Sequence, residues 1–405
     1  MEWCVFDRRI MHIHGGGAVC SSTAAGAETT TGQSVTVSLR LVPPPLTSYM
    51  EIHTDSVSTD ATDSSFSFYG QASILAAHGD LTLIYGVVVV KGARPADYPG
   101  NFFLYKASPA CPSLRLLPCP GKPWRGRAKF TGVLHLHGGG GGDGDDFVVA
   151  HLQGLVGAEG EEVAELFRYS SCSGEWELLR IDMPGNADRG FYPQSWYTDT
   201  VFSDGSFMYW ADYHQGLLSC DVSAEHPRLQ FIKFPGIETK IDFDEGRGLP
   251  EILRTVSFSR GRIMWFVDVD DGRFRSRWSS LCSPSVTMWS REGTEWVQEH
   301  AMDLGELWSS AKYRQSCLPR TVPEFPVLDM EENGLVHFIV RESNDDETEH
   351  WIATIDMTTA TLKSHRKYIN QIETLHLGYD TTNMFWDSAL LSSQLCRCFN
   401  QPAGN

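Results

Sequence analysis

Short runs in which apolar and polar residues alternate recur along the chain, and most of them come in pairs joined by a turn. A side-chain period of two is typical of a β-strand, so each pair predicts a β-hairpin. One such hairpin appears five times in succession, with strands at 103–106 and 114–117, 166–169 and 176–179, 217–221 and 229–232, 286–289 and 296–297, and 352–356 and 361–362. This repetition indicates a repeat architecture, because one such unit cannot bury its hydrophobic face alone.

A tighter hairpin precedes each of these pairs. Its turns contain glycine, which supplies the positive φ that a short hairpin turn needs. They are His78-Gly79-Asp80, Ser203-Asp204-Gly205, Arg260-Gly261 and Glu332-Asn333-Gly334. In the second unit the glycine-rich stretch 138–144 stands in place of the tight turn.

Two hairpins make four strands, and five such units are expected, at about 72–120, 131–184, 196–235, 252–304 and 326–370. Radially repeated four-stranded sheets form a β-propeller. We therefore predict an all-β propeller of four-stranded blades, with six blades of which the last is shared between the chain termini. Its closing strands would lie at 35–41, 374–377 and 384–386. Five blades, or a two-sheet sandwich, are the alternatives, and helix is expected only at 304–313 and 382–394.

The N-terminal part differs in composition from the rest. Residues 1–65 predict one strand and flexible loops rich in glycine, serine and threonine. Three prolines at 43–45 end that strand, because proline cannot donate a hydrogen bond to a β-ladder. Residues 66–395 are predicted to form a single β-propeller domain, and residues 396–405 a tail.

The chain is acidic, with 51 acidic and 33 basic residues and a formal net charge of -18. Such a surface repels phosphate backbones and anionic lipid heads, so neither nucleic acid nor a membrane is expected as a partner. The basic stretch 122–129 is the exception, and it is interpreted as a solvated loop between two strands. The longest apolar run, 83–90, is too short to span a bilayer.

The ten cysteines are irregularly spaced and include no CxxC pair, so no zinc knuckle or thioredoxin-type motif is recognised. The first residues lack the basic and apolar regions of a signal peptide, and no Asn-x-Ser/Thr acceptor occurs. These features predict an intracellular protein, in the cytoplasm or nucleus. We expect it to be monomeric.

Sequence strings in the third to fifth units resemble those of a known family. They are WYTD at 196–199, FMYWAD at 207–212, GLL at 216–218, CD at 220–221, IMWFV at 263–267, TMW at 287–289, FPVL at 325–328 and WI at 351–352. Together with SLRLVPPP at 38–45, they resemble the uncharacterised plant family, expanded in cereals, that is built on the domain of unknown function DUF1618. The resemblance covers most of the chain and is strongest over 196–370. It implies a likeness to F-box-associated propeller-like domains but no assigned reaction, and no leucine-rich helical F-box segment precedes residue 72.

Few residues suggest chemistry. His135 and His137 would share one face of a strand, where two imidazoles can hold a metal ion with an aspartate from 143–146 as third ligand. Two ligands without a defined third are a weak signal, so a surface or pore-lining pair is the preferred interpretation. The glycine-rich stretch 138–144 lacks the lysine and the helix of a P-loop. The acidic turns 242–246 and 268–272 lack the full ligand set of a calcium loop.

Catalytic signatures are absent from the sequence as well. No GxSxG elbow and no recognised Cys/His signature occur, so we predict no enzyme, no catalytic, cofactor-binding or metal-binding residue, and no cofactor. Trp124, Trp196 and Trp308 lie in irregular segments and are candidates for a recognition surface. Tryptophans inside the predicted strands, such as Trp210 and Trp265, are expected in the core.

The sequence therefore predicts a non-catalytic scaffold that recognises an unidentified protein partner through propeller loops. An alternative is a carbohydrate-binding module or sugar-active enzyme with its site at the propeller channel. A third hypothesis, a degraded paralogue under little functional constraint, is motivated by the glycine insertion at 138–144.

Overall fold

The fold is taken from a computed structural model of the whole chain. The residues it describes are all those outside 15–18, 55–71, 91, 95–96, 122–126, 137–145, 155–162, 185–189, 238–246, 260, 272–282, 344–347, 369–389 and 400–405. The chain divides into two compact units. Unit 1 comprises Met1–Val42, Ser48–Lys233 and Ser393–Asn405, and unit 2 comprises Pro43–Thr47 and Phe234–Ser392.

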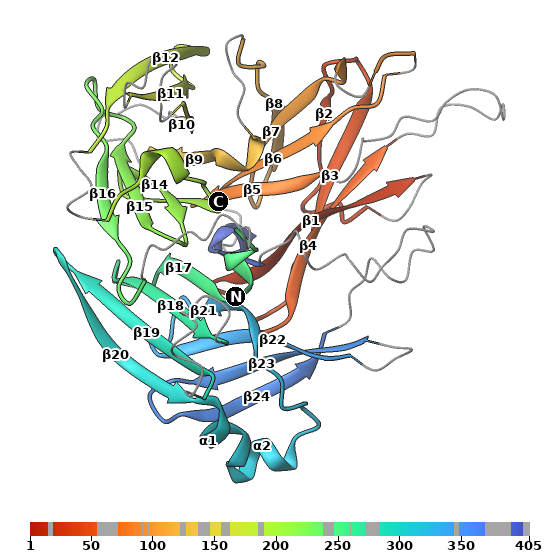
Figure 1. Cartoon of the computed structure of the whole chain (residues 1–405). Helices are drawn as coiled ribbons and strands as arrows, with labels where there is room; N and C mark the ends of the chain where they lie inside the picture. Colours follow the sequence, from red (N-terminus) through yellow and green to blue (C-terminus); the bar gives the residue numbers. More distant parts are fainter. Residues whose placement is uncertain are drawn as a thin grey trace. The chain divides into compact units, whose positions relative to one another are not determined.

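Unit 1 begins with a large antiparallel sheet in the order β2-β3-β4-β1-β5-β6-β7-β8 (Figure 1). Its strands are β1 (Cys4–His14), β2 (Ala25–Glu28), β3 (Ser34–Arg40), β4 (Thr47–Thr54), β5 (Ser73–His78), β6 (Leu81–Val87), β7 (Gly100–Lys106) and β8 (Ser113–Leu116). The predicted strand 35–41 is β3, and β1, β2 and β4 surround it where the sequence indicated loops.

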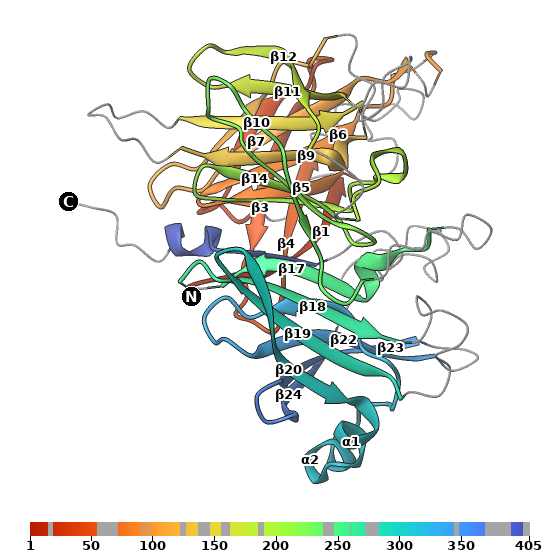
Figure 2. The ribbon, with the colours of Figure 1, turned by 60° about the vertical axis from the view of Figure 1, so that its left-hand side comes forward.

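Two four-stranded sheets complete the β-structure of unit 1, and each pairs its strands in chain order. The first contains β9 (Thr131–His135), β10 (Phe147–Gln153), β11 (Val163–Ser170) and β12 (Glu175–Asp182). The second contains β13 (Thr200–Asp204), β14 (Phe207–Asp212), β15 (Gly216–Asp221) and β16 (Gln230–Lys233). Their antiparallel order is visible in Figure 2, where β9 to β12 lie side by side.

Unit 2 repeats this plan with two more four-stranded sheets. One contains β17 (Arg254–Phe258), β18 (Met264–Asp270), β19 (Ser285–Glu292) and β20 (Glu295–Asp303). The other contains β21 (Glu324–Leu328), β22 (Leu335–Ser343), β23 (Thr348–Asp356) and β24 (Thr361–Lys367). Among the described residues, β1 to β24 thus form six consecutive groups of four, and the five predicted units correspond to the last five.

The all-β prediction with repeated four-stranded antiparallel blades is confirmed. The first strands of successive groups lie side by side in unit 1, where β5 contacts β9 and β13, and β9 contacts β13. This is the arrangement of the inner strands of a propeller. The sixth group is β1–β4, from the N-terminal region. The predicted closing strands 374–377 and 384–386 lie outside the described residues.

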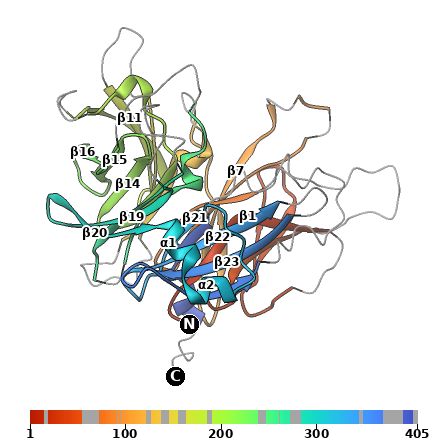
Figure 3. The same ribbon diagram turned by 60° about the horizontal axis from the view of Figure 1, so that its bottom comes forward.

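Helix is confined to short segments. The predicted helix 304–313 is present as α1 (Leu304–Ser309) and α2 (Ala311–Gln315), which contact β20 and β24 (Figure 3). The Asp303 carboxylate accepts the Glu306 N–H at the start of α1, and the Ser310 hydroxyl accepts the Tyr313 N–H at the start of α2. Ser310 therefore ends one helix and caps the next. The helix predicted at 382–394 is wrong in its described part, where Leu390–Ser393 form strand β25.

Each sheet buries apolar side chains against a neighbouring sheet, and β10 does so on both faces. Val148 and Leu152 join a core shared with β13–β16, whereas Phe147 and Val149 join a core shared with β5–β8. Period-two alternation thus sends successive side chains into two different cores. Complete burial of one such side chain stabilises the fold by about 1.5–3 kcal/mol. In unit 2 a third core lies between β17–β20 and β21–β24.

Gly216, the first residue of β15, offers a test of this packing. A Cβ atom on Gly216 would clash with the carbonyl oxygen of Ile232 and with the Phe231 ring. Backbone cannot yield as a flexible side chain does, so Gly216→Ala should lower the free energy of unfolding by about 1–3 kcal/mol. Denaturant unfolding followed by tryptophan fluorescence measures the change.

Gly121 provides the matched control, because a Cβ atom there would have no neighbour within 4 Å. Gly121→Ala should change the free energy of unfolding by less than about 0.5 kcal/mol. Equal effects of the two variants would mean that β15 and β16 are not packed as described.

Candidate functional site

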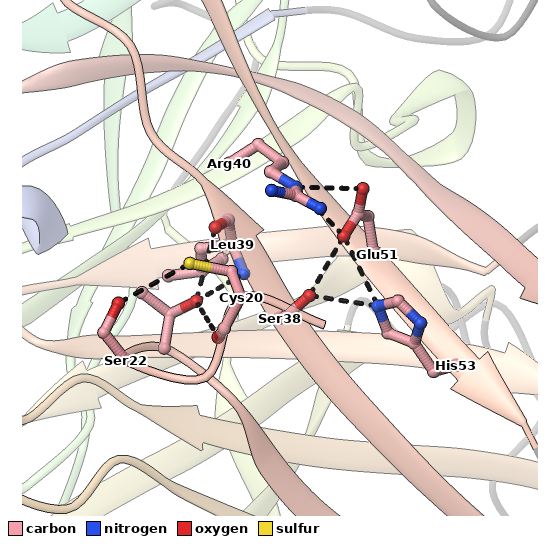
Figure 4. Close-up of polar contacts among 8 residues, drawn as sticks. Cys20, Ser22, Ser38, Leu39, Arg40, Glu51 and His53 are labelled. Atoms are coloured by element: carbon pink, nitrogen blue, oxygen red, sulfur yellow. Dashed lines mark hydrogen bonds and ion pairs between the residues drawn. The ribbon is translucent and has the colours of Figure 1, made fainter. Parts of the chain in front are cut away.

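A polar face on β3 and β4 is the first cluster of chemically capable side chains. Ser38 lies directly opposite Glu51 in the antiparallel register, and Arg40 and His53 lie on the same face two residues further along their strands. Figure 4 shows the four side chains converging between the two strands. Ser38 and Glu51 are buried, whereas Arg40 is more open to solvent.

The contacts of this cluster resemble a catalytic triad in composition only. The Ser38 hydroxyl lies 3.1 Å from Glu51 Oε2 and 3.1 Å from His53 Nε2, and His53 Nε2 is 3.3 Å from the same carboxylate oxygen. A triad histidine uses one ring nitrogen for the nucleophile and the other for the acid. Here one nitrogen faces both groups. Arg40 Nε donates to Glu51 at 3.2 Å, so the arrangement is a charge-paired support between two strands.

Cys20 lies beside this cluster and carries a perturbed thiol. Hydrogen bonds from the Ser22 and Thr23 hydroxyls lower its pKa, with a smaller contribution from the charge of Arg40, and they outweigh the opposing effect of burial. The Ser22 hydroxyl is 3.5 Å from the sulfur. Cys20 is partly exposed. The sequence gave no sign of this environment, because nothing in it distinguishes Cys20 from the other nine cysteines.

At the predicted histidine site, His135 is paired with Asp80, a residue that the sequence did not suggest as its partner. His135, at the end of β9, places Nδ1 2.9 Å from Asp80 Oδ1, and its backbone N–H donates to His78 Nδ1 at 3.0 Å. Burial raises the pKa of Asp80, but the hydrogen bond and charge of His135, together with Lys106, lower it below the ordinary value. His137 and the aspartates 143 and 145 lie outside the described residues.

No metal-binding group emerges from the residues with described positions, which contain no cluster of three or more His, Cys, Asp or Glu side chains that could hold an ion. Asp268, from the calcium-like turn 268–272, is instead 2.5 Å from Arg254 Nε across β17 and β18. The glycine-rich stretch 138–144 and the acidic turn 242–246 lie outside the described residues.

The tryptophan predictions have mixed outcomes. Trp210 and Trp265 are buried, as predicted. Trp196 and Trp308 are partly buried, and each packs one side against a hydrophobic core. The Trp196 indole also donates to the Thr198 hydroxyl at 3.1 Å. Trp124 lies outside the described residues.

A partly exposed cluster is built around Tyr197, a residue that entered the sequence analysis only as part of a family string. Arg127 Nη1 donates to the Tyr197 hydroxyl at 2.6 Å, and its guanidinium carbon lies 5.2 Å from the ring centroid. Lys129 Nζ lies 4.6 Å from the same centroid. Two cations thus share one aromatic ring, an arrangement favoured by the ring quadrupole. We call Arg127, Lys129 and Tyr197 the cationic–aromatic surface.

Aromatic packing holds this surface from beneath. Phe130 meets the Tyr197 ring edge-on at 5.4 Å and stacks at 6.1 Å on the buried His151. The Trp210 indole donates to the Phe130 carbonyl at 2.9 Å. Burial lowers the pKa of His151 to about 3, so the imidazole is neutral when the protein is folded.

A buried carboxylate fixes the loop that carries Tyr197. Asp212 Oδ2 accepts the Tyr197 N–H and the Gln215 side-chain amide, both at 3.0 Å. Gln215 Oε1 accepts the Tyr192 N–H at 2.8 Å. These bonds fix the loop backbone by a network centred on the buried Asp212 and Gln215 side chains. The family strings WYTD and FMYWAD therefore have a structural role in placing the cationic–aromatic surface.

The neutral state of His151 predicts a pH dependence. The unfolded chain protonates this histidine below its ordinary pKa of 6.5, whereas the folded protein resists protonation down to about 3. Unfolding then takes up a proton, so stability should fall with decreasing pH by up to about 1.4 kcal/mol per pH unit. His151→Asn should reduce this slope between these two pH values, as measured by denaturant titrations at several pH values.

Some slope should remain in the variant, because burial and the charge of Arg341 lower the pKa of His350 to about 4. A variant with the wild-type pH slope would show that His151 titrates normally in the folded protein.

One family model matches the chain. It is DUF1618, described as a protein of unknown function, and it matches residues 210–337. The matched segment begins in β14 and ends in β22, so it includes parts of both units. No curated protein matches the chain. No helix in the described portion of the chain is both long and apolar enough to cross a membrane.

Remote likenesses to solved structures also exist. The β-propeller domain of Nup133 from Vanderwaltozyma polyspora is 9% identical with a TM-score of 0.36, over 77% of each chain. An ulvan lyase of polysaccharide lyase family PL25 is 8% identical with a TM-score of 0.35, over 91% of this chain and 87% of that chain. At such scores neither likeness bears on function. The match of residues 210–337 to the DUF1618 model agrees with the resemblance found in the sequence strings.

Proposed function

We propose that this protein is a non-catalytic recognition module that binds an acidic peptide segment of a partner protein on the cationic–aromatic surface. The observation that carries the proposal is the convergence of Arg127 and Lys129 on the Tyr197 ring. A guanidinium has five N–H donors in a planar fork that matches a carboxylate, and the bond to Tyr197 uses one of them.

Charge supports an acidic peptide rather than a polyanion as the ligand. The chain carries a net charge of -18, which repels a long polyanion such as nucleic acid. A short segment with one or two carboxylates needs only a local positive site. The net negative charge of the chain also disfavours non-specific anions, because these make too few close contacts to overcome the long-range repulsion. We include in the proposal that the protein acts as a monomer and does not bind nucleic acid.

Rigidity of the surface is a second support. Tyr197 is held by the Asp212 carboxylate through its backbone and by Phe130 through its ring. A surface that is ordered before binding loses less conformational entropy when a ligand arrives. An intracellular location is part of the proposal, since the described cysteines are free thiols, as suits a reducing compartment.

One observation favours a sugar-directed function as the second candidate. Asp80, in the turn after β5, and His135, at the end of β9, form a carboxylate–histidine pair where these two strands are in contact. Hydrolysis of a glycosidic bond ordinarily uses two carboxylates that flank it. The partners of Asp80 are basic instead, namely His135 and Lys106. Recognition of a protein is therefore the function that we propose first.

Binding of fluorescent peptides tests the proposal. The full chain should bind short peptides rich in Asp and Glu, and should bind their Asn and Gln counterparts more weakly. Arg127→Ala should weaken binding of the acidic peptides about tenfold, as expected for the loss of a central charged anchor. Fluorescence anisotropy at fixed ionic strength measures both effects.

Arg94→Ala is the matched control, since Arg94 is an exposed arginine of unit 1 that pairs with Asp97 away from this surface. It should leave peptide binding unchanged. Equal affinity for acidic and neutral peptides would contradict the proposal, as would equal losses in the two arginine variants. A thermal shift with acidic oligosaccharides that Asp80→Asn abolishes would instead support the second candidate.

A further inference from the structure

The start of β1 and the segment after β25 meet within unit 1. In all three views the violet 3₁₀ helix η7 (Leu395–Phe399) lies beside the N-terminus (Figures 1, 2 and 3). Arg397 Nε donates to the Glu2 carbonyl at 2.9 Å and lies 3.1 Å from the Glu2 carboxylate. Residues nearly four hundred positions apart in sequence are therefore neighbours.

Two buried cysteines face each other at this junction. Cys4 and Cys396 both have no exposed surface. The Cys4 thiol donates to the Ser393 carbonyl at 3.6 Å, and the Cys396 thiol contacts the Met1 carbonyl at 3.5 Å. Each sulfur thus contacts backbone of the opposite segment. The two buried thiols are close enough for each to shift the pKa of the other.

The two thiols differ in acidity because of this contact. The hydrogen bond from Cys4 lowers the pKa of Cys396, against the opposing effect of burial. The same bond, together with burial, raises the pKa of Cys4 strongly. Such a pair divides the roles needed for oxidation: the more acidic thiol attacks an oxidant, and the second thiol resolves the product.

We propose that Cys4 and Cys396 form an oxidative modification site that peroxide converts to a disulfide, which locks the segment of η7 onto β1. The Cys396 thiolate attacks hydrogen peroxide, the O–O bond breaks, and the products are a sulfenic acid and hydroxide. The Cys4 thiol then attacks the sulfenic sulfur, which forms the S–S bond and releases water. Two thiols and one peroxide thus give one disulfide and two waters.

Peroxide reaches the pair when η7 opens locally. Leu395 and Cys396 of this helix are buried, so local opening must expose them, and the polar contacts of the junction are those of Arg397 and the two thiols. The disulfide would connect segments that are far apart in sequence, so it would restrict the unfolded chain strongly. It would also tie down the strand β1, whose Arg8 bonds to β5 and β13.

Peptide mapping of the oxidised full chain tests this site. Treatment of the wild-type protein with hydrogen peroxide should yield a cross-linked pair of peptides containing Cys4 and Cys396, with a mass two hydrogens lower than their sum. Dithiothreitol should reverse it. Thiol titration should fall by at least two groups per chain, and the melting temperature should rise by several degrees. Cys4→Ser and Cys396→Ser should each abolish the cross-link and the rise.

Cys111→Ser is the control, because Cys111 is exposed and distant in sequence from both partners. It should form the cross-link as the wild type does. Since the wild-type map needs no variant, a folding defect in a serine variant does not weaken the test. The proposal is overturned if Cys396 reaches the sulfinic acid without a cross-link, if Cys396 pairs with another cysteine such as Cys398, or if the cross-link leaves the melting temperature unchanged.

Discussion

Burial on two faces is the constraint on which the rest of this structure depends. In β10 the consecutive residues Phe147, Val148 and Val149 are all apolar, so the sheet has apolar side chains on both faces. Such a sheet is stable only between two other sheets. This requirement orders the sheets of unit 1 in sequence and brings β5, β9 and β13 side by side. The same logic operates in unit 2, where one core joins two sheets.

Polar groups inside such a stack need partners, and the fold supplies them from distant segments. Arg8 of β1 donates to the Leu75 carbonyl at 2.5 Å and to the Thr200 hydroxyl at 2.9 Å, so one side chain connects three strands. Glu51 is satisfied in a similar way by Ser38 and Arg40. Removing Arg40 would leave the buried Glu51 carboxylate without its charged partner, which is more costly than losing an exposed ion pair. Clusters that look catalytic in composition thus serve the packing of β-strands.

The proposed function, in contrast, depends on polar groups that face outward from the packed sheets. The cationic–aromatic surface lies on an irregular segment, but its backbone is held by Asp212 and its ring by Phe130. Cys4 and Cys396 lie instead where two segments distant in sequence meet. The cationic–aromatic surface offers a preorganised charge, and the junction offers a buried pair of thiols.

The sequence alone determined the strand pattern, because alternation and glycine turns are local properties: Gly79 and Gly205 adopt the positive φ that their turns require. It therefore predicted the four-stranded units, while the resemblance to the family came from particular strings such as FMYWAD. It did not reveal β1, because Asp7, Arg8 and Arg9 interrupt the apolar alternation, and Arg8 finds its partners on distant strands. Nor did it pair His135 with Asp80, surround Tyr197 with Arg127 and Lys129, or bring Cys4 to Cys396. Such contacts join residues far apart in the chain, and tertiary packing alone decides which of them meet.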